Sequence, residues 1–203
     1  APIKERNYLE YNWEEKRRLK FAERRHHERV ICERTPIIVS TSEQISLTLV
    51  SHYNIHPDRI MYFPPCVGDD FVPRQREQCE KGLAYLAAHS ELSVEQLRDA
   101  RILLEVSRAD TTKRKDLVLD GFAQALDKLD NSYLFIIGGP TNKIVTKLLS
   151  YISTHPKLAG RAFIIPENVP KHALVEIFAA ADVYISASEM EGFGMSVLQS
   201  TAC

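Results

Sequence analysis

The chain has 203 residues, and its 44% hydrophobic and 26% charged residues exclude a disordered polypeptide and are typical of a globular protein. The formal net charge of −1 provides no overall positive field, so nucleic acid and anionic membrane surfaces are not expected partners. No apolar run approaches the roughly 18 residues that cross a bilayer, so no transmembrane segment is expected.

Cysteine usage and the start of the chain favour a reducing compartment. The four cysteines show neither a CxxC pair nor metal-site spacing, so free thiols are expected at Cys32, Cys66, Cys79 and Cys203. Residues 1–34 are dense in charge and lack the apolar stretch of a secretory signal. The predicted location is the cytoplasm.

The first third of the chain predicts few elements. Residues 10–34 favour a helix, because they are rich in Glu, Lys and Arg and hold neither Gly nor Pro. Short strands are expected at 37–39 and 59–63, with a helix over 43–50 between them. Residues 64–73 hold three prolines and a glycine and are interpreted as a stiff connection between domains.

The rest of the chain alternates strands and helices. Residues 74–100 favour two helical pieces, the second starting at Ser93 with Gln96 completing a capping box. Apolar strands are then expected at 102–107, 134–137, 162–165 and 183–186, and helices at 116–129, 142–152, 170–181 and from near Gly194. This order predicts an α/β, Rossmann-like parallel sheet with helices on both faces. The last helix lacks a stop signal, so a piece of a longer chain is expected.

The turn after the first of these strands carries two cations at the edge where open parallel sheets bind ligands. Arg108 and Lys113 are five residues apart and can flank one anion, for which a pyrophosphate is suitable. The alternative is a pair of solvated surface cations.

The turn after the last strand carries an acid and two glycines that lead into a helix. Gly192 and Gly194 bracket Phe193 and would let a backbone approach a phosphate at the helix start, with Met195 following. Glu191 could accept hydrogen bonds from sugar hydroxyl groups. The alternative is a tight turn capped by a carboxylate.

Other motifs give weaker signals. Gly138-Gly139 follows a strand and is compatible with close backbone approach, but no GxGxxG, phosphate-binding loop or nucleophile elbow occurs. His26-His27-Glu28 lacks HExxH spacing, so no metal site is expected.

Together these turns resemble the donor domain of the family-4 retaining glycosyltransferases, which have two Rossmann-like domains and the GT-B type of fold. The motifs that carry the resemblance are Arg108 and Lys113 after a strand, a strand ending in Gly138-Gly139, the helix–strand run 177–185, and the acid–Gly-Phe-Gly loop 191–194. Residues 64–67 resemble the interdomain linker, so the resemblance covers residues 36–203. Four motifs in the family's order are hard to obtain by chance.

The resemblance implies that residues 66–203 form a truncated donor domain for a nucleotide sugar, and that residues 1–65 hold the end of the acceptor domain and the linker. The implied reaction in carbohydrate biosynthesis transfers a hexose, with retention, from a UDP- or GDP-linked sugar to a sugar or sugar phosphate. No cofactor or metal is implied, since the cations take the metal's place. The chain alone is expected to be inactive.

The resemblance also implies roles for individual residues. Arg108 and Lys113 would hold the donor diphosphate and stabilise the leaving group, and Glu191 would bind a hydroxyl of the donor sugar. The remaining donor-binding residues would be Gly138, Asn168, Val169, Gly192, Phe193, Gly194, Met195 and Gln199.

Two positions depart from the family's pattern. Gln199 stands where the family has a Glu that binds the ribose, and Ser196 replaces a common proline. An amide lacks charge assistance and binds a hydroxyl group more weakly. Gln199 and the expected absence of most of the acceptor domain and part of the donor domain keep open an alternative, a non-catalytic nucleotide-sugar-binding or interaction module. A third is an unrelated doubly wound protein, in which Arg108 and Lys113 need not face the 192–194 loop.

Within the family, residues 16–23 and 40–45 resemble the acceptor domain of sucrose-phosphate synthase and its relatives, and mannosylfructose-phosphate synthase fits equally well. Arg17 and Arg18 are then candidates for binding an acceptor phosphate. The alternative is that both are solvated charges on a long helix.

Overall fold

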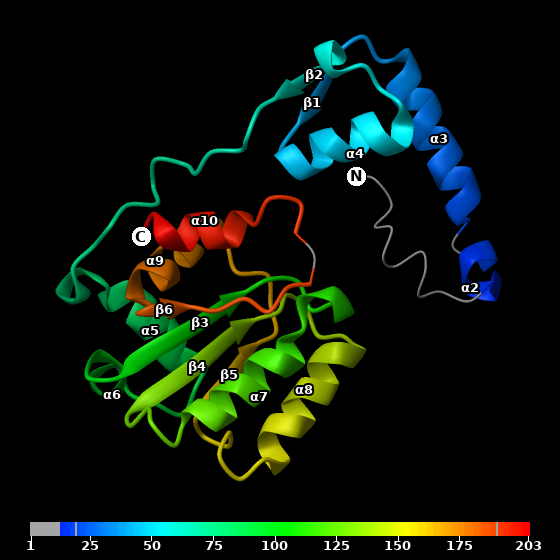
Figure 1. Ribbon diagram of the computed structural model, residues 1–203. Coiled ribbons are helices and arrows are strands. Elements are labelled where there is room, and N and C mark those ends of the chain that lie inside the picture. The colour runs from blue at the N-terminus through cyan, green and yellow to red at the C-terminus, as the bar shows by residue number, and fades with distance from the viewer. Residues whose placement is uncertain (1–12, 19, 190) are drawn as a thin grey trace. The chain divides into compact units, whose positions relative to one another are not determined.

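The computed structural model describes residues 13–203 apart from residues 19 and 190 (Figure 1). The chain divides into two compact units, the first ending at Cys66 and the second beginning at Val67. Each unit contains a parallel sheet with helices packed against it, so the α/β prediction is confirmed.

The first unit is a small strand–helix–strand arrangement. Its two strands pair in parallel, with Ile38 opposite Ile60, and α4 connects them. Its core is built around Leu49, Tyr53 and Ile55. The elements are α2 (Trp13–Arg18), α3 (Phe21–Arg34), β1 (Ile38–Ser40), α4 (Glu43–Tyr53), the 3-10 turn η1 (Pro57–Arg59) and β2 (Ile60–Tyr62).

The single helix predicted over residues 10–34 is wrong in its continuity. Residues 10–12 lie outside the described residues, and α2 and α3 are separated at Lys20, whose φ of 53° is left-handed. No glycine or proline there announces the break, and we have no physical account of it. The end of α3 is fixed by Arg59, which donates hydrogen bonds to the backbone oxygens of Cys32 at 2.7 Å and Glu33 at 3.1 Å.

The second unit is a four-stranded parallel sheet with helices on both faces. It begins with the 3-10 turn η2 (Arg76–Gln78) and the helices α5 (Glu80–Ala88) and α6 (Val94–Arg98). The elements that follow are β3 (Arg101–Val106), the 3-10 turn η3 (Thr111–Lys113), α7 (Lys115–Ala125), β4 (Ser132–Ile137), α8 (Lys143–Thr154), β5 (Ala162–Ile165), α9 (Lys171–Ala180), β6 (Val183–Tyr184) and α10 (Met195–Thr201).

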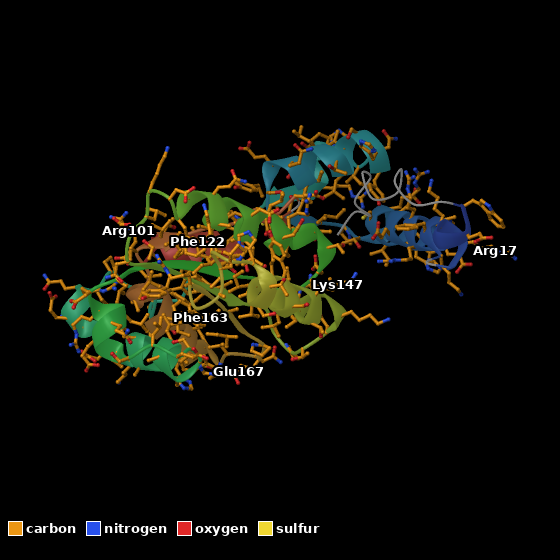
Figure 2. The ribbon with its side chains drawn as sticks, turned by 90° about the horizontal axis from the view of Figure 1, so that it is seen from below. Arg17, Arg101, Phe122, Lys147, Phe163 and Glu167 are labelled. Atoms are coloured by element: carbon orange, nitrogen blue, oxygen red, sulfur yellow. The ribbon has the colours of Figure 1, made fainter. Side chains whose placement is uncertain are left out.

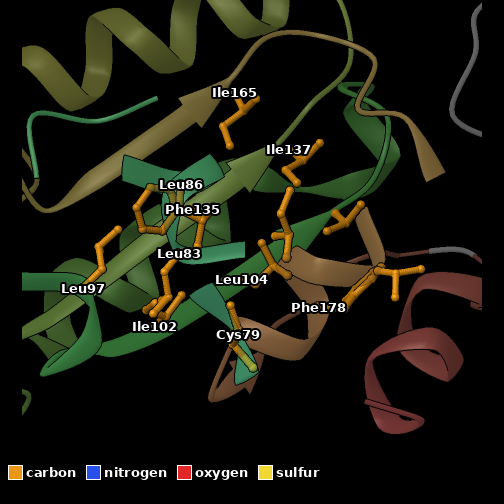
Figure 3. Close-up of a cluster of buried hydrophobic side chains, with 14 of the residues drawn as sticks. Cys79, Leu83, Leu86, Leu97, Ile102, Leu104, Phe135, Ile137, Ile165 and Phe178 are labelled. Carbon is orange, nitrogen blue, oxygen red and sulfur yellow. The ribbon is translucent and has the colours of Figure 1, made fainter. Parts of the chain in front are cut away.

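Side chains of alternate strand residues pack into two separate cores, because successive side chains of a strand point to opposite faces of the sheet. One core joins α5, α6 and α9 to the sheet, and Figure 3 shows Leu83 and Leu86 of α5 beside Phe135 of β4. The other core joins α7 and α8 to the opposite face. Phe122 and Phe163 consequently lie on opposite sides of the sheet (Figure 2).

The strand order is β5-β4-β3-β6, so the chain reverses its direction of travel across the sheet at β3. From β3 it proceeds outward through β4 and β5, and it then returns to add β6 on the other side of β3. Helix α7 follows β3 onto one face, whereas α10 follows β6 and packs near α9 on the other. The loops after β3 and β6 therefore start at neighbouring strand ends and lead to opposite faces of the sheet. Doubly wound sheets bind their ligands between such loops.

Most of the predicted elements are present, and the deviations are at their ends. Ser93 and Gln96 form the predicted capping box at α6. Helix α7 ends at Ala125, earlier than the predicted 129, and β6 covers only Val183–Tyr184 because its ladder with β3 is two residue pairs long. All four cysteines are free thiols, as predicted.

Candidate functional site

The loops that follow β3 and β6 enclose a cavity of about 290 Å³. The cavity is lined by the loop after β3, by Tyr184 of β6, and by the loop before α10 with the first turn of that helix. The lining residues are Ser107, Arg108, Lys113, Tyr184, Glu191, Phe193, Gly194, Met195, Ser196 and Val197. The two cations predicted from the sequence therefore face the same cavity as the glycine loop, which the unrelated-fold alternative did not require.

The loop after β3 is shaped by Asp110. Its Oδ1 accepts hydrogen bonds from the backbone N–H of Thr112 at 2.9 Å and from the hydroxyl of Thr112 at 2.6 Å, which starts the 3-10 turn η3. The side chain of Arg108 is 88% exposed and lies 3.8 Å from the Asp110 carboxylate, whereas that of Lys113 is only 13% exposed. The loop thus presents one solvated and one partly desolvated cation.

The loop before α10 is tied to the first loop by two ion pairs and a backbone bond. Lys113 Nζ lies 2.5 Å from Glu191 Oε1, and Arg114 Nη1 lies 2.8 Å from Glu189 Oε1. The backbone N–H of Glu189 donates to the Thr112 oxygen at 2.9 Å. These contacts join residues about 75 positions apart in the sequence and fix the spacing between cations and acid.

The two glycines of this loop differ in their conformational demands. Gly194 has a φ of 86°, a left-handed conformation that strains side-chain-bearing residues, at the position before α10. A Cβ atom built on Gly192 would meet nothing within 4 Å, so the fold itself does not require glycine there. Open space at Gly192 leaves its backbone accessible to a ligand.

Tyr184 and Ser107 line the cavity but were not predicted as site residues. The hydroxyl of Tyr184 donates to the Val106 oxygen at 3.1 Å. Burial, together with the nearby Glu105 carboxylate, raises the pKa of Tyr184 to about 12, so its hydroxyl stays protonated at neutral pH. A tyrosine within an otherwise apolar strand is the sequence signal that could have identified it.

Several predicted site residues lie outside the residues that line the cavity. Gly138 is buried at the end of β4, where its oxygen accepts from the Ala109 N–H at 2.9 Å. Asn168 is exposed and Val169 half-buried in the loop after β5. Glu167 beside them (labelled in Figure 2) accepts a hydrogen bond from Tyr85 of α5 and lies 3.2 Å from His89, which follows that helix.

The remaining predicted residues lie on helices or in the loop before α10. Gln199 is half-buried on α10, and Gly192 lies in the loop between Glu191 and Phe193, which both line the cavity. Arg17 lies exposed on α2 (Figure 2), and the side chain of Arg18 lies outside the described residues.

Two absences concern only the part of the chain that the structure describes. Within it, no helix is long and apolar enough to cross a membrane. The same residues contain no group of three or more His, Cys, Asp or Glu side chains placed to hold a metal ion.

Relatives with known names resemble this chain over most of its length. It is 30% identical over 185 residues to D-inositol 3-phosphate glycosyltransferase of Geodermatophilus obscurus, an alignment that covers 87% of this chain and 38% of the relative. It is 23% identical over 195 residues to mannosylfructose-phosphate synthase of Agrobacterium fabrum, covering 90% of this chain and 39% of that protein. The chain therefore spans about two fifths of the length of these relatives.

Solved structures share the fold. HepE of Anabaena, determined in complex with UDP and glucose, superimposes with a TM-score of 0.66 at 13% sequence identity, covering 83% of this chain and 42% of HepE. The fold is that of GT-B glycosyltransferases. The model of the family "Glycosyl transferases group 1" matches residues 91–203, more than half of the chain and the whole segment from α6 to α10. The chain belongs to the group 1 glycosyl transferases.

Proposed function

We propose that this chain carries the donor site of a retaining glycosyltransferase that moves a hexose from a UDP- or GDP-linked sugar to a sugar or sugar phosphate. The observation that carries the proposal is the cavity at the switch point of the sheet, where Arg108, Lys113 and Glu191 meet the Phe193–Met195 backbone. Cations beside a carboxylate suit a ligand whose anionic diphosphate is joined directly to a hydroxyl-rich sugar.

In this proposal the cations bind the donor diphosphate. Lys113 is a partly desolvated point charge, and Arg108 offers a planar fork that can swing from solvent onto a phosphate oxygen. As the bond between sugar and phosphate breaks, negative charge grows on the leaving nucleoside diphosphate. Charges already fixed at that position stabilise the transition state more than the ground state.

Glu191 lies within 2.5 Å of Lys113, so one ligand can contact both. We assign Glu191 to a hydroxyl of the donor sugar, and the backbone of Gly192, Phe193 and Gly194 to sugar and phosphate. Gln199 would bind the ribose, and the exposed loop with Asn168 and Val169 would lie near the base. Retention follows because the acceptor hydroxyl attacks the donor sugar on the same face from which the phosphate leaves. The leaving phosphate accepts the proton of that hydroxyl, and no metal takes part.

The acceptor is proposed to be phosphorylated. Both relatives are named for a phosphorylated compound, as D-inositol 3-phosphate glycosyltransferase and mannosylfructose-phosphate synthase. Arg17 and Arg18 remain the candidates for binding it in this chain.

Calorimetric titration of the chain with UDP, GDP and ADP tests the donor site. We expect selective binding of one nucleotide and a loss of about 10- to 100-fold in affinity for Lys113→Ala, since a hydrogen bond to a charged group contributes about 1.5–3 kcal/mol. Lys147→Ala is the matched control, because Lys147 is exposed on α8 outside the cavity (Figure 2). Equal affinity for wild type and Lys113→Ala would contradict the assignment of Lys113.

Absence of binding to all three nucleotides would instead favour the non-catalytic interaction module, which Gln199 keeps open. In a chain that binds a nucleotide, Gln199→Glu tests whether Gln199 contacts the ribose. If Gln199 binds the ribose, a carboxylate there should tighten nucleotide binding through a charge-assisted hydrogen bond. Unchanged or weaker affinity would place Gln199 away from the ribose.

A further inference from the structure

A buried ion pair lies beside the cavity, between residues that the proposed function does not use. Glu105 of β3 and Lys115, the first residue of α7, form a salt bridge with both side chains only 1% exposed. Glu105 shares its face of the strand with Leu103, which belongs to the apolar core against α7 and α8. A carboxylate in this place is an exception to the apolar pattern of the sheet.

The pair is completed by Ser107, which lines the cavity. The ammonium group of Lys115 has three N–H donors, and it contacts Glu105, the Ser107 hydroxyl at 3.0 Å and the Ile137 backbone oxygen at 3.5 Å. The Ser107 hydroxyl in turn donates to the other oxygen of Glu105. The three side chains therefore form a closed ring in which each polar group is satisfied.

Stability alone does not explain this ring. Burial raises the pKa of Glu105 and lowers that of Lys115, and the attraction between the two opposes both shifts. Desolvation of two charges offsets much of their attraction, so well-packed apolar residues of similar volume are often as stable or more so. An ion pair specifies direction and distance, however, which an apolar contact does not.

The ring joins the two ends of the loop that carries the cavity's cations. Ser107 immediately precedes Arg108, and Lys115 comes two residues after Lys113. Between Lys113 and Lys115 the chain passes through Arg114, whose φ of 44° is left-handed and strained for a residue with a side chain. The loop thus has a strained turn at one end and a buried anchor that spans both ends.

We propose that Glu105 and Lys115 are positioning residues, which hold the Arg108–Lys113 loop at the spacing needed to bind the donor diphosphate. This inference rests on the proposed function, because it assumes that the two cations bind a diphosphate. Neither residue is among those that line the cavity, so both act through the loop.

The test replaces the pair by apolar residues of similar volume in E105L/K115M and titrates the chain with UDP and with inorganic pyrophosphate. The matched control is D127L/K157M, which removes an ion pair at 2.5 Å with both partners substantially exposed. We expect E105L/K115M to unfold within about 4 °C of the wild type, but to bind both probes at least tenfold more weakly. The control should bind like the wild type.

Wild-type affinity in a folded E105L/K115M chain would overturn the inference while leaving the proposed function intact. If that variant does not fold, E105Q/K115M keeps an acceptor for the Ser107 hydroxyl and is judged by the same criterion. Failure of the wild type itself to bind UDP, GDP and pyrophosphate would overturn the proposed function and the inference with it.

Discussion

Helices α5 and α9 approach each other so closely at Gly82 that a single methyl group there should separate them. A Cβ atom on Gly82 would lie 2.1 Å from the backbone oxygen of Glu176 and 2.9 Å from the Cβ of Ala180. Neither atom can move by a change of rotamer, so Gly82→Ala requires the helices to move apart by roughly 1 Å, given the usual separation of packed atoms.

Two opposing effects set the magnitude. Overpacking a well-packed core costs about 1–3 kcal/mol, and a clash with backbone belongs at the upper end. Alanine has a helix propensity about 1 kcal/mol better than glycine, which offsets part of this. The net loss should be about 2 kcal/mol, which lowers Tm by about 4–8 °C in a chain of this size.

Gly121 provides the matched control. It lies within α7, and a Cβ atom there would meet nothing within 4 Å. Gly121→Ala should therefore show only the propensity gain, about 0.5–1 kcal/mol, and raise Tm by about 1–4 °C. The assay is urea and thermal unfolding followed by far-UV circular dichroism, because the single tryptophan, Trp13, belongs to the first unit. A Gly82→Ala chain as stable as Gly121→Ala would refute the argument from close packing.

Two further predictions concern single side chains. Arg76→Met should lower the free energy of unfolding by about 3 kcal/mol in urea titrations, since Arg76 donates to three backbone oxygens at 2.7–3.0 Å and to Asp182. Arg101→Met at an exposed position is the control. Equal losses in the two variants would argue against a stabilising role for the hydrogen bonds of Arg76. Burial raises the pKa of Asp110, but hydrogen bonds from Thr112 and the charge of Arg108 outweigh it and leave that pKa lowered. A lowered carboxyl pKa contributes stability above its unfolded value of about 3.9 and loses it as pH falls through the folded value. The stability difference between wild type and Asp110→Ala should accordingly be constant from about pH 7 to 5 and begin to shrink below about pH 4. A difference that grows below about pH 4 would contradict this sign.

Local sequence patterns determined the order and type of the elements in the second unit. Apolar runs such as 134–137 are bounded by glycine, proline or polar residues, and Ser93 with Gln96 marks a helix start by a hydrogen-bond pattern within four residues. Alternating strands and helices then restrict the fold to a covered parallel sheet. The same reasoning placed Arg108, Lys113 and Gly194 at strand ends, because strand ends can be read from the sequence.

The break at Lys20 and the short β6 could not be predicted in this way. Neither is marked by a glycine or proline, and the length of β6 depends on how much of β3 it meets. Element ends are decided by tertiary pairing when the local signals are neutral.

Only the tertiary structure decided which strand ends are neighbours. The sequence gives the order of strands along the chain, whereas the position of β6 beside β3 follows from packing of the helices on two faces. That placement brings Lys113 within 2.5 Å of Glu191, 78 residues away, and makes Tyr184 part of the cavity. Folding of α7 onto β3 also buries Glu105 against Lys115, a partner that the charged residue in an apolar run does not reveal in the sequence. Long-range contacts of this kind depend on the geometry of the whole sheet, and no local pattern encodes them.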